Sequence, residues 1–105
     1  MMTLEQIREN PIAATSGIAK AMQDPPAHAY ILHCLDCFFT GNYGAMPAED
    51  TEANNRELQA GTGRIIARYK AAEGLREDVY IIAYFSDTEQ GNDYNYTTVM
   101  YTGEY

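Results

Sequence analysis

Four side chains between His33 and Cys37 could carry out chemistry. Cys34 and Cys37 have the CxxC spacing of redox-active thiols, and His33 and Asp36 are three residues apart, so on a helix they could share a metal ion or a proton. A redox pair requires a preceding strand and a helix N-terminus beneath it, and a structural zinc site requires a second pair of ligands. The segment lacks both, which predicts two structural thiols and no cofactor. A metal- or ligand-binding accessory enzyme that uses His33, Asp36 and Cys37 is the alternative.

Two other catalytic patterns are incomplete. Gly61-Thr62-Gly63 lacks the Lys-Ser/Thr pair of a phosphate-binding P-loop and leads into a predicted strand, whereas a P-loop leads into a helix. The two serines, Ser16 and Ser86, are not placed beside a histidine that could activate a nucleophile. We therefore expect no enzymatic activity.

Acidic residues dominate the charge of the chain. The formal net charge is −8, from 15 acidic and 7 basic residues, and five of the bases lie between residues 56 and 76. Six carboxylates without an obvious partner follow the last base, Arg76: Glu77, Asp78, Asp87, Glu89, Asp93 and Glu104. Such a surface repels the phosphates of nucleic acids and of anionic membranes. The predicted partner is therefore a basic protein surface, with neither direct nucleic-acid binding nor membrane binding.

Six of the chain's nine tyrosines lie in the same C-terminal stretch as these acids. Tyrosine combines apolar area with a polar tip and is enriched at protein interfaces. An acidic surface can also serve only to keep a chain soluble. If the surface binds a partner, the predicted contacts are the acids of a helix start, the acids and tyrosines of a hairpin, and one tyrosine before that helix: Glu49, Asp50, Glu52, Asp87, Glu89, Asp93, Tyr94, Tyr96 and Tyr43.

Length and composition predict a single domain over residues 1–105. The longest apolar run, residues 79–85, is far shorter than the ~20 residues of a membrane-spanning helix. The first residues lack the regions of a signal peptide, and two free thiols are typical of a reducing compartment. We expect the cytoplasm of a bacterial host.

Apolar spacing predicts helices in the first 60 residues. A stripe formed by Ile31, Cys34, Leu35 and Phe38 indicates a central helix over residues 27–39, after a break at Asp24-Pro25-Pro26. Shorter helices are expected over residues 4–9, behind the capping-box spacing of a threonine and a glutamine, and over residues 18–23. A last helix begins at Pro47 and ends at Gly61.

After Gly63 the spacing is typical of strands. Residues 64–70, 79–85 and 96–101 have alternating or β-branched composition with short connections, which predicts an antiparallel meander. Residues 12–15 are a possible fourth strand. The predicted fold is α+β, with three or four strands and two to four helices packed on one face. The predicted core includes Ile31, Leu35, Phe38, Ile65 and Ile81.

Short motifs occur in a fixed order through residues 28–105. They are His33, Gly41, Tyr43, Gly44, Asp50, Ala53-Asn54, Gly63-Arg64, Tyr69, Ile81-Ile82, Thr97-Thr98 and Glu104-Tyr105. In this order they resemble a family of small "plasmid-related" proteins of bacterial mobile elements and phages. The chain departs from the family at Tyr43, where tryptophan is usual, and in a longer hairpin turn at residues 86–95. The resemblance implies a mobile-element origin and carries no settled enzymatic activity.

Small acidic proteins of such elements are often inhibitors of host defence. Together with the acids and tyrosines, the resemblance predicts a counter-defence protein, an anti-CRISPR that binds a CRISPR effector complex and blocks nucleic-acid binding or cleavage. Effector channels that hold nucleic acid are positively charged, so a carboxylate-rich surface is complementary to them. Besides the accessory enzyme described above, a non-catalytic accessory protein of a mobile element is an alternative.

Overall fold

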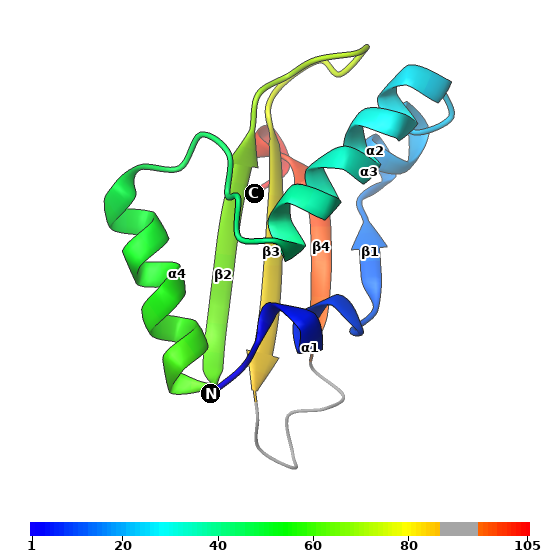
Figure 1. Ribbon diagram of the computed structural model, residues 1–105. Helices are drawn as coiled ribbons and strands as arrows, with labels where there is room; N and C mark the ends of the chain where they lie inside the picture. Colours follow the sequence, from blue (N-terminus) through cyan, green and yellow to red (C-terminus); the bar gives the residue numbers. More distant parts are fainter. Residues whose placement is uncertain (87–94) are drawn as a thin grey trace.

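The computed structural model describes residues 1–86 and 95–105 of the chain. Helices pack against a four-stranded sheet (Figure 1), so the fold is α+β, as predicted. In chain order the elements are α1 (Leu4–Arg8), β1 (Ile12–Ala14), α2 (Ser16–Ala21), α3 (Pro25–Phe39), α4 (Ala48–Ala60), β2 (Thr62–Tyr69), β3 (Val79–Ser86), β4 (Tyr96–Tyr101) and a 3-10 turn, η2 (Thr102–Glu104).

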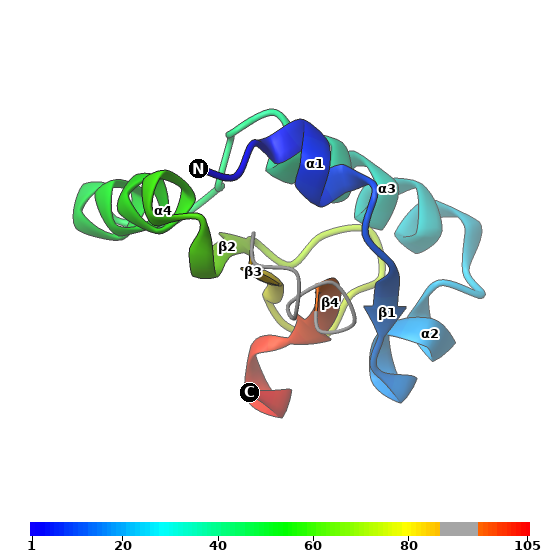
Figure 2. The same cartoon turned by 90° about the horizontal axis from the view of Figure 1, so that it is seen from below.

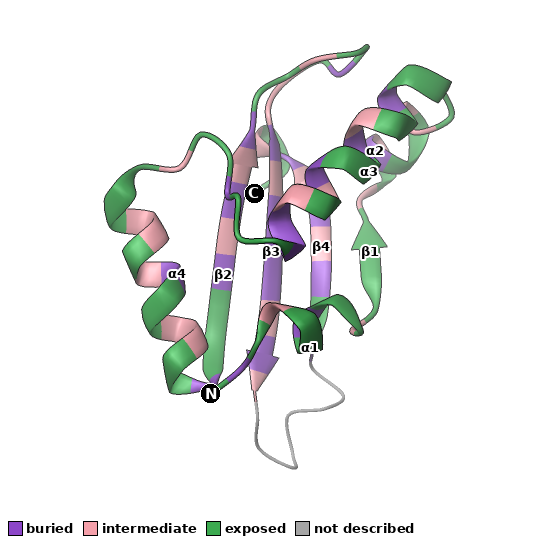
Figure 3. Cartoon of the chain, viewed as in Figure 1, coloured by how far each residue is buried: buried purple, intermediate pink, exposed green. Residues whose placement is uncertain are grey.

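The strands lie in the order β1-β4-β3-β2. β2, β3 and β4 form the predicted antiparallel meander, with Ile66 opposite Ile82 and Ile82 opposite Thr98. β1 is a fourth strand, and it pairs parallel to β4. All three residues of β1 are exposed (Figure 3), so their side chains carry no burial pattern from which its pairing direction could have been predicted.

One face of the sheet forms the core. Figure 2 shows α1 and α3 over this face and the C-terminus on the opposite side. Ile31, Phe38, Ile65 and Ile81 are buried, as predicted. Leu35 is only partly buried, so its prediction was wrong: Ile31, Cys34 and Phe38 fill the buried side of α3, and Leu35 lies at the border of that side.

The central helix begins earlier than predicted. Pro25 and Pro26 form the first turn of α3, and Asp24 is its N-cap residue. Proline fits this position because its fixed φ suits a helix and its missing N–H would have no partner in the first turn. The two prolines therefore begin the helix and do not separate it from the preceding segment.

The outer edge of β2 is covered by α4 and by the segment that precedes it. The side chain of Asn54, 2% exposed, donates from Nδ2 to the carbonyl of Ile66 at 2.8 Å and accepts from its N–H at 3.1 Å. Next along the strand, the N–H of Arg68 donates to the carbonyl of Tyr43, and the carbonyl of Arg68 accepts from the N–H of Ala45. These hydrogen bonds satisfy backbone N–H and C=O groups of an edge strand that could otherwise pair with another chain.

Gly44 makes this approach possible. Its φ is +71°, and a Cβ atom at this position would lie 2.2 Å from the carbonyl oxygen of Arg68. A side chain is therefore excluded both by the backbone conformation and by the neighbouring strand.

Candidate partner-binding surfaces

The first two turns of α4 present acidic side chains. Glu49 and Glu52 are exposed, and Asp50 is partly buried. The N-cap residue Pro47 supplies no side-chain hydrogen bond, so carboxylates in the first turn stabilise the positive end of the helix dipole. None of the ion pairs within residues 1–86 and 95–105 includes these three carboxylates. They are therefore free to meet cations of a partner.

Asp50 also lines a groove where α4 meets the end of β2. The groove has a volume of about 470 Å³, and its walls are Ala45, Met46, Pro47, Asp50, Arg68, Lys70 and Tyr80. Its charged walls thus combine one acid with two bases. Of the three acids at the start of α4, Asp50 is the one that lines this groove.

The hairpin half of the predicted surface is described only at Tyr96. Asp87, Glu89, Asp93 and Tyr94 lie outside the described residues. Tyr96, 41% exposed, begins β4, and its ring centroid lies 5.1 Å from that of Tyr84. Two strands of the sheet thus separate Tyr96 from the edge that α4 covers.

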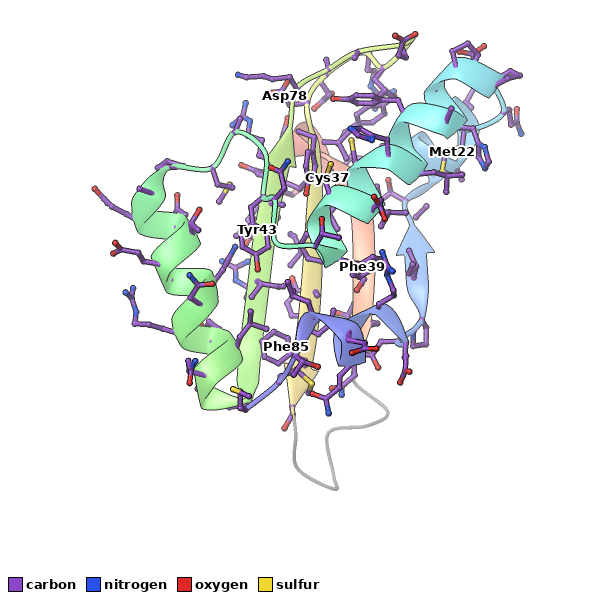
Figure 4. All side chains as sticks on the ribbon, viewed as in Figure 1. Met22, Cys37, Phe39, Tyr43, Asp78 and Phe85 are labelled. Atoms are coloured by element: carbon purple, nitrogen blue, oxygen red, sulfur yellow. The ribbon has the colours of Figure 1, made fainter. Side chains whose placement is uncertain are left out.

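Tyr43 is not a surface contact, which corrects the sequence-based prediction. It is 5% exposed, its ring lies edge-on to Phe38 at 5.9 Å, and it sits over the sheet between α3 and α4 (Figure 4). Burial raises the pKa of its hydroxyl. A large aromatic residue after a helix C-terminus can fill the gap between two helices and the sheet, and sequence alone did not distinguish this role from exposure.

Three of the six carboxylates that follow Arg76 are engaged within the chain. Asp78 accepts hydrogen bonds from the N–H of Ala71 and from Nε of Arg68, both at 2.9 Å, and these contacts hold its pKa below the usual range. It lies at the end of the sheet shown at the top of Figure 4. The residue joins the end of β2 to the start of β3.

The other two engaged carboxylates, Glu104 and Glu77, accept hydrogen bonds that hold the C-terminal turn η2 in place. Glu104 accepts from the N–H of Tyr101 and from the hydroxyl of Thr15, both at 2.8 Å, and these hydrogen bonds lower its pKa. Glu77 accepts from the N–H of Gly103 at 2.5 Å and from the hydroxyl of Thr102 at 3.3 Å. The expectation that Glu77, Asp78 and Glu104 lack partners was therefore wrong, because backbone donors are not apparent from sequence.

The thiols of α3 differ in their surroundings. Cys34 is buried, and burial raises its pKa to about 11. Cys37 is half-buried, with its sulfur 3.6 Å from Nε2 of His33, whereas Asp36 pairs with Arg8 at 3.1 Å. Within the described residues no three His, Cys, Asp or Glu side chains converge as a metal site. The alternative that uses His33, Asp36 and Cys37 thus gains no support from the geometry.

Sequence reasoning missed a row of tyrosine and arginine side chains on the open face of the sheet. We call Tyr96, Tyr84, Arg64, Tyr105, Tyr80 and Arg68 the Tyr–Arg row. Arg64 links its two halves: it hydrogen-bonds to the hydroxyl of Tyr105, which raises the pKa of the guanidinium, and it lies opposite Tyr84 in the strand register. The alternation of residues along the predicted strands indicated which tyrosines and arginines share one face. It did not indicate the register of the strands, which decides which of these side chains are neighbours.

No helix within the described ranges has the length and apolar character needed to cross a membrane. Compared with known proteins, the chain matches no family model, no curated protein and no solved structure. The resemblance of residues 28–105 to the plasmid-related proteins therefore stays a prediction.

Proposed function

We propose that the protein is a counter-defence inhibitor, an anti-CRISPR, which binds a basic surface of a CRISPR effector complex. The observation that carries this proposal is the group of carboxylates at the start of α4: Glu49, Asp50 and Glu52 make no ion pair among the described residues. A partner that supplies Lys or Arg can therefore gain these interactions without breaking existing ones.

The support beneath α4 favours binding. Asn54 fixes the middle of the helix to β2, and the N–H of Met2 donates to the carbonyl of Leu58 at 2.8 Å near its end. A helix held at several points loses little conformational freedom when its surface is bound. The acids are thus presented in a fixed arrangement.

Inhibition would follow from charge complementarity. Channels that hold the guide–target duplex are lined with cationic side chains that contact the backbone of the duplex. Carboxylates that occupy such a channel compete with phosphates, and long-range attraction accelerates the encounter. The sequence also predicts that the charges of Asp87, Glu89 and Asp93, which lie outside the described residues, would add to this attraction.

The direct experiment is a target-cleavage assay with a panel of purified effector complexes. We expect the parent protein to inhibit at least one complex and the variant with Glu49, Asp50 and Glu52 changed to Lys to lose most of that inhibition. The control changes three other exposed acids, Glu5, Glu9 and Asp24, to Lys. It carries the same net charge and should remain an inhibitor.

Two results would contradict the proposal. Absence of inhibition across the panel would contradict the function, and the non-catalytic accessory protein would then be favoured. Equal inhibition by the parent and the α4 variant would contradict the assignment of the surface.

A further inference from the structure

The face of the sheet opposite α1 and α3 carries no acid at any outward position of its three long strands. The register places these positions in three rows across β2, β3 and β4: Arg64, Tyr84 and Tyr96; Ile66, Ile82 and Thr98; Arg68, Tyr80 and Met100. Two of the nine positions are arginine and three are tyrosine. The charged residues at these nine positions are therefore all basic, in a chain that has 15 acidic and 7 basic residues.

The Tyr–Arg row crosses this face as two groups of contacts, which meet at the cross-strand neighbours Arg64 and Tyr84. Ring centroids of Tyr96 and Tyr84 are 5.1 Å apart, and those of Tyr105 and Tyr80 are 5.5 Å apart. The guanidinium of Arg64 lies 5.7 Å from the ring centroid of Tyr105, and that of Arg68 lies 5.9 Å from the ring centroid of Tyr80. These contacts hold long side chains in place before any ligand arrives.

Two tyrosines of the row keep much of their surface exposed. Tyr96 is 41% exposed and Tyr105 is 63% exposed, and Arg64 lies over the ring of Tyr105 and is the cross-strand neighbour of Tyr84, which pairs with Tyr96. The tail that carries Tyr105 is fixed by the hydrogen bonds of Glu77 and Glu104. The row therefore offers two exposed rings with a cation in the region between them.

At its other end the row continues into the groove beside α4. Arg68, Lys70 and Tyr80 line that groove, and Lys70 is exposed, with its ammonium 3.8 Å from Asp78. The aligned cations along the face are thus Arg64, Arg68 and Lys70. Asp78 pairs with Arg68 at 2.9 Å and lies 3.8 Å from the ammonium of Lys70, and Asp50 is the acid in the wall of the groove.

We propose that this face binds a single-stranded nucleic acid, with bases stacked on Tyr96 and Tyr105 and phosphates contacting Arg64, Arg68 and Lys70. Aromatic rings interleaved with cations are the elements by which sheets hold single strands without sequence readout. The chain's net charge argued against such binding, but exposed charges are screened beyond about 8–10 Å, so the local cations act on a bound strand.

Charge decides against the second obvious occupant, another copy of the chain. Two copies meeting through this face would each bring three cations, Arg64, Arg68 and Lys70, of which the last two share the single carboxylate of Asp78. Cations in excess would then face each other, whereas a strand of phosphates is complementary to them. This inference is independent of the proposed function.

The test is fluorescence anisotropy with a fluorescein-labelled oligo(dT), titrated with the intact protein at several salt concentrations. We expect saturable binding that weakens with salt, with a slope of log K against log salt of about −2, because three phosphate contacts each contribute about −0.7 on a single strand. A matching duplex should bind more weakly, because its bases are not free to stack. No binding at low salt, or equal binding of duplex and single strand, would overturn the proposal.

Variants identify the face. Tyr96→Leu should weaken binding about tenfold through loss of one stack, whereas Tyr96→Phe keeps the ring and should bind nearly as the parent does. Arg64→Gln should reduce the salt slope by about 0.7, and Lys20→Gln, which removes an exposed charge on α2, should leave it unchanged. If Arg64→Gln and Lys20→Gln reduce the salt slope equally, binding depends only on the overall charge of the protein, and the proposed site is wrong.

Asp50→Asn separates this inference from the proposed function. Asp50 lies in the groove with Arg68 and Lys70, so its neutralisation should strengthen binding of oligo(dT). The same change should weaken binding to a basic protein partner. A loss of affinity for oligo(dT) in this variant would contradict the placement of phosphates beside Arg68 and Lys70.

Discussion

Asn54 has a structural role that its residue type does not indicate. An asparagine on a polar helix is expected at the surface, yet the oxygen and the nitrogen of its amide both hydrogen-bond to the backbone of Ile66. The amide supplies the hydrogen bonds that a neighbouring strand would otherwise make with the edge strand β2. Its partner lies 12 residues away, so the role depends on how α4 packs and cannot be deduced from the sequence of the helix.

Asn54→Ala should therefore destabilise the protein by about 1–3 kcal/mol, because it leaves a backbone donor and acceptor of Ile66 without their partner. Chemical denaturation followed by circular dichroism measures the change. Asn55→Ala, on the exposed side of the same helix, is the control and should stay within about 0.5 kcal/mol of the parent. Equal effects of the two substitutions would show that the edge contact is not a stabilising one.

The two thiols should differ in reactivity. Alkylation requires an accessible thiolate, and burial both shields Cys34 and raises its pKa to about 11. Under native conditions we expect iodoacetamide to modify Cys37 first, with Cys34 reacting only after unfolding, as read by mass spectrometry of tryptic peptides. Similar native rates at both positions would contradict the packing of α3.

At the scale of elements, the sequence predicted most of the fold. The helices, the three long strands and their meander follow from apolar spacing, and β1 and α2 were expected to within a few residues. What it could not predict depends on contacts between distant segments. The parallel pairing of β1, the burial of Tyr43 and the pairing of Asp78 with Arg68 are all set by the way that elements meet. For the same reason the sequence did not show that Glu77, Asp78 and Glu104 have partners within the chain, or that Asp50 is partly buried beside the exposed Glu49 and Glu52.

The packing of α3 gives a graded stability prediction. Ile31→Ala should cost about 2–5 kcal/mol, since Ile31 is fully enclosed by the core. Leu35→Ala should cost less than about 2 kcal/mol, because Leu35 is only partly buried at the border of the helix. Thermal or chemical denaturation of both variants checks the order, and a larger loss for Leu35→Ala would reverse our assignment of the buried side.

The connections at the ends of β2 and β4 predict an acid-sensitive fold. Asp78 and Glu104 have folded-state pKa values lowered by hydrogen bonds, so their contribution is present above the unfolded pKa of about 4 and is lost as pH falls through the lower folded value. Asp78→Asn should thus reduce stability at neutral pH and make it depend less on pH below about 4. Denaturation curves between neutral and acidic pH test this, and parallel pH profiles for parent and variant would contradict it.

The charged residues of the whole molecule are unevenly distributed over its surfaces. The carboxylates at the start of α4 make no ion pair among the described residues, whereas the nine outward positions of β2, β3 and β4 include two arginines and no acid, with Asp78 beside Arg68 at the end of the sheet. The net charge of −8 is therefore not a measure of the local charge at either surface. Each surface should respond to salt and to substitution in its own way, and the two proposals can succeed or fail separately.

The most direct test of the proposed function is the association rate between the protein and the effector complex that it inhibits. Measured at low and high salt, the rate for the parent should fall as salt rises, because attraction between exposed charges is screened. The variant with Glu49, Asp50 and Glu52 changed to Lys should associate slowly at low salt, and the control with Glu5, Glu9 and Asp24 changed to Lys should associate faster than it. Equal rates for parent and α4 variant at both salt concentrations would show that the acids of α4 do not steer the encounter, and would contradict the account.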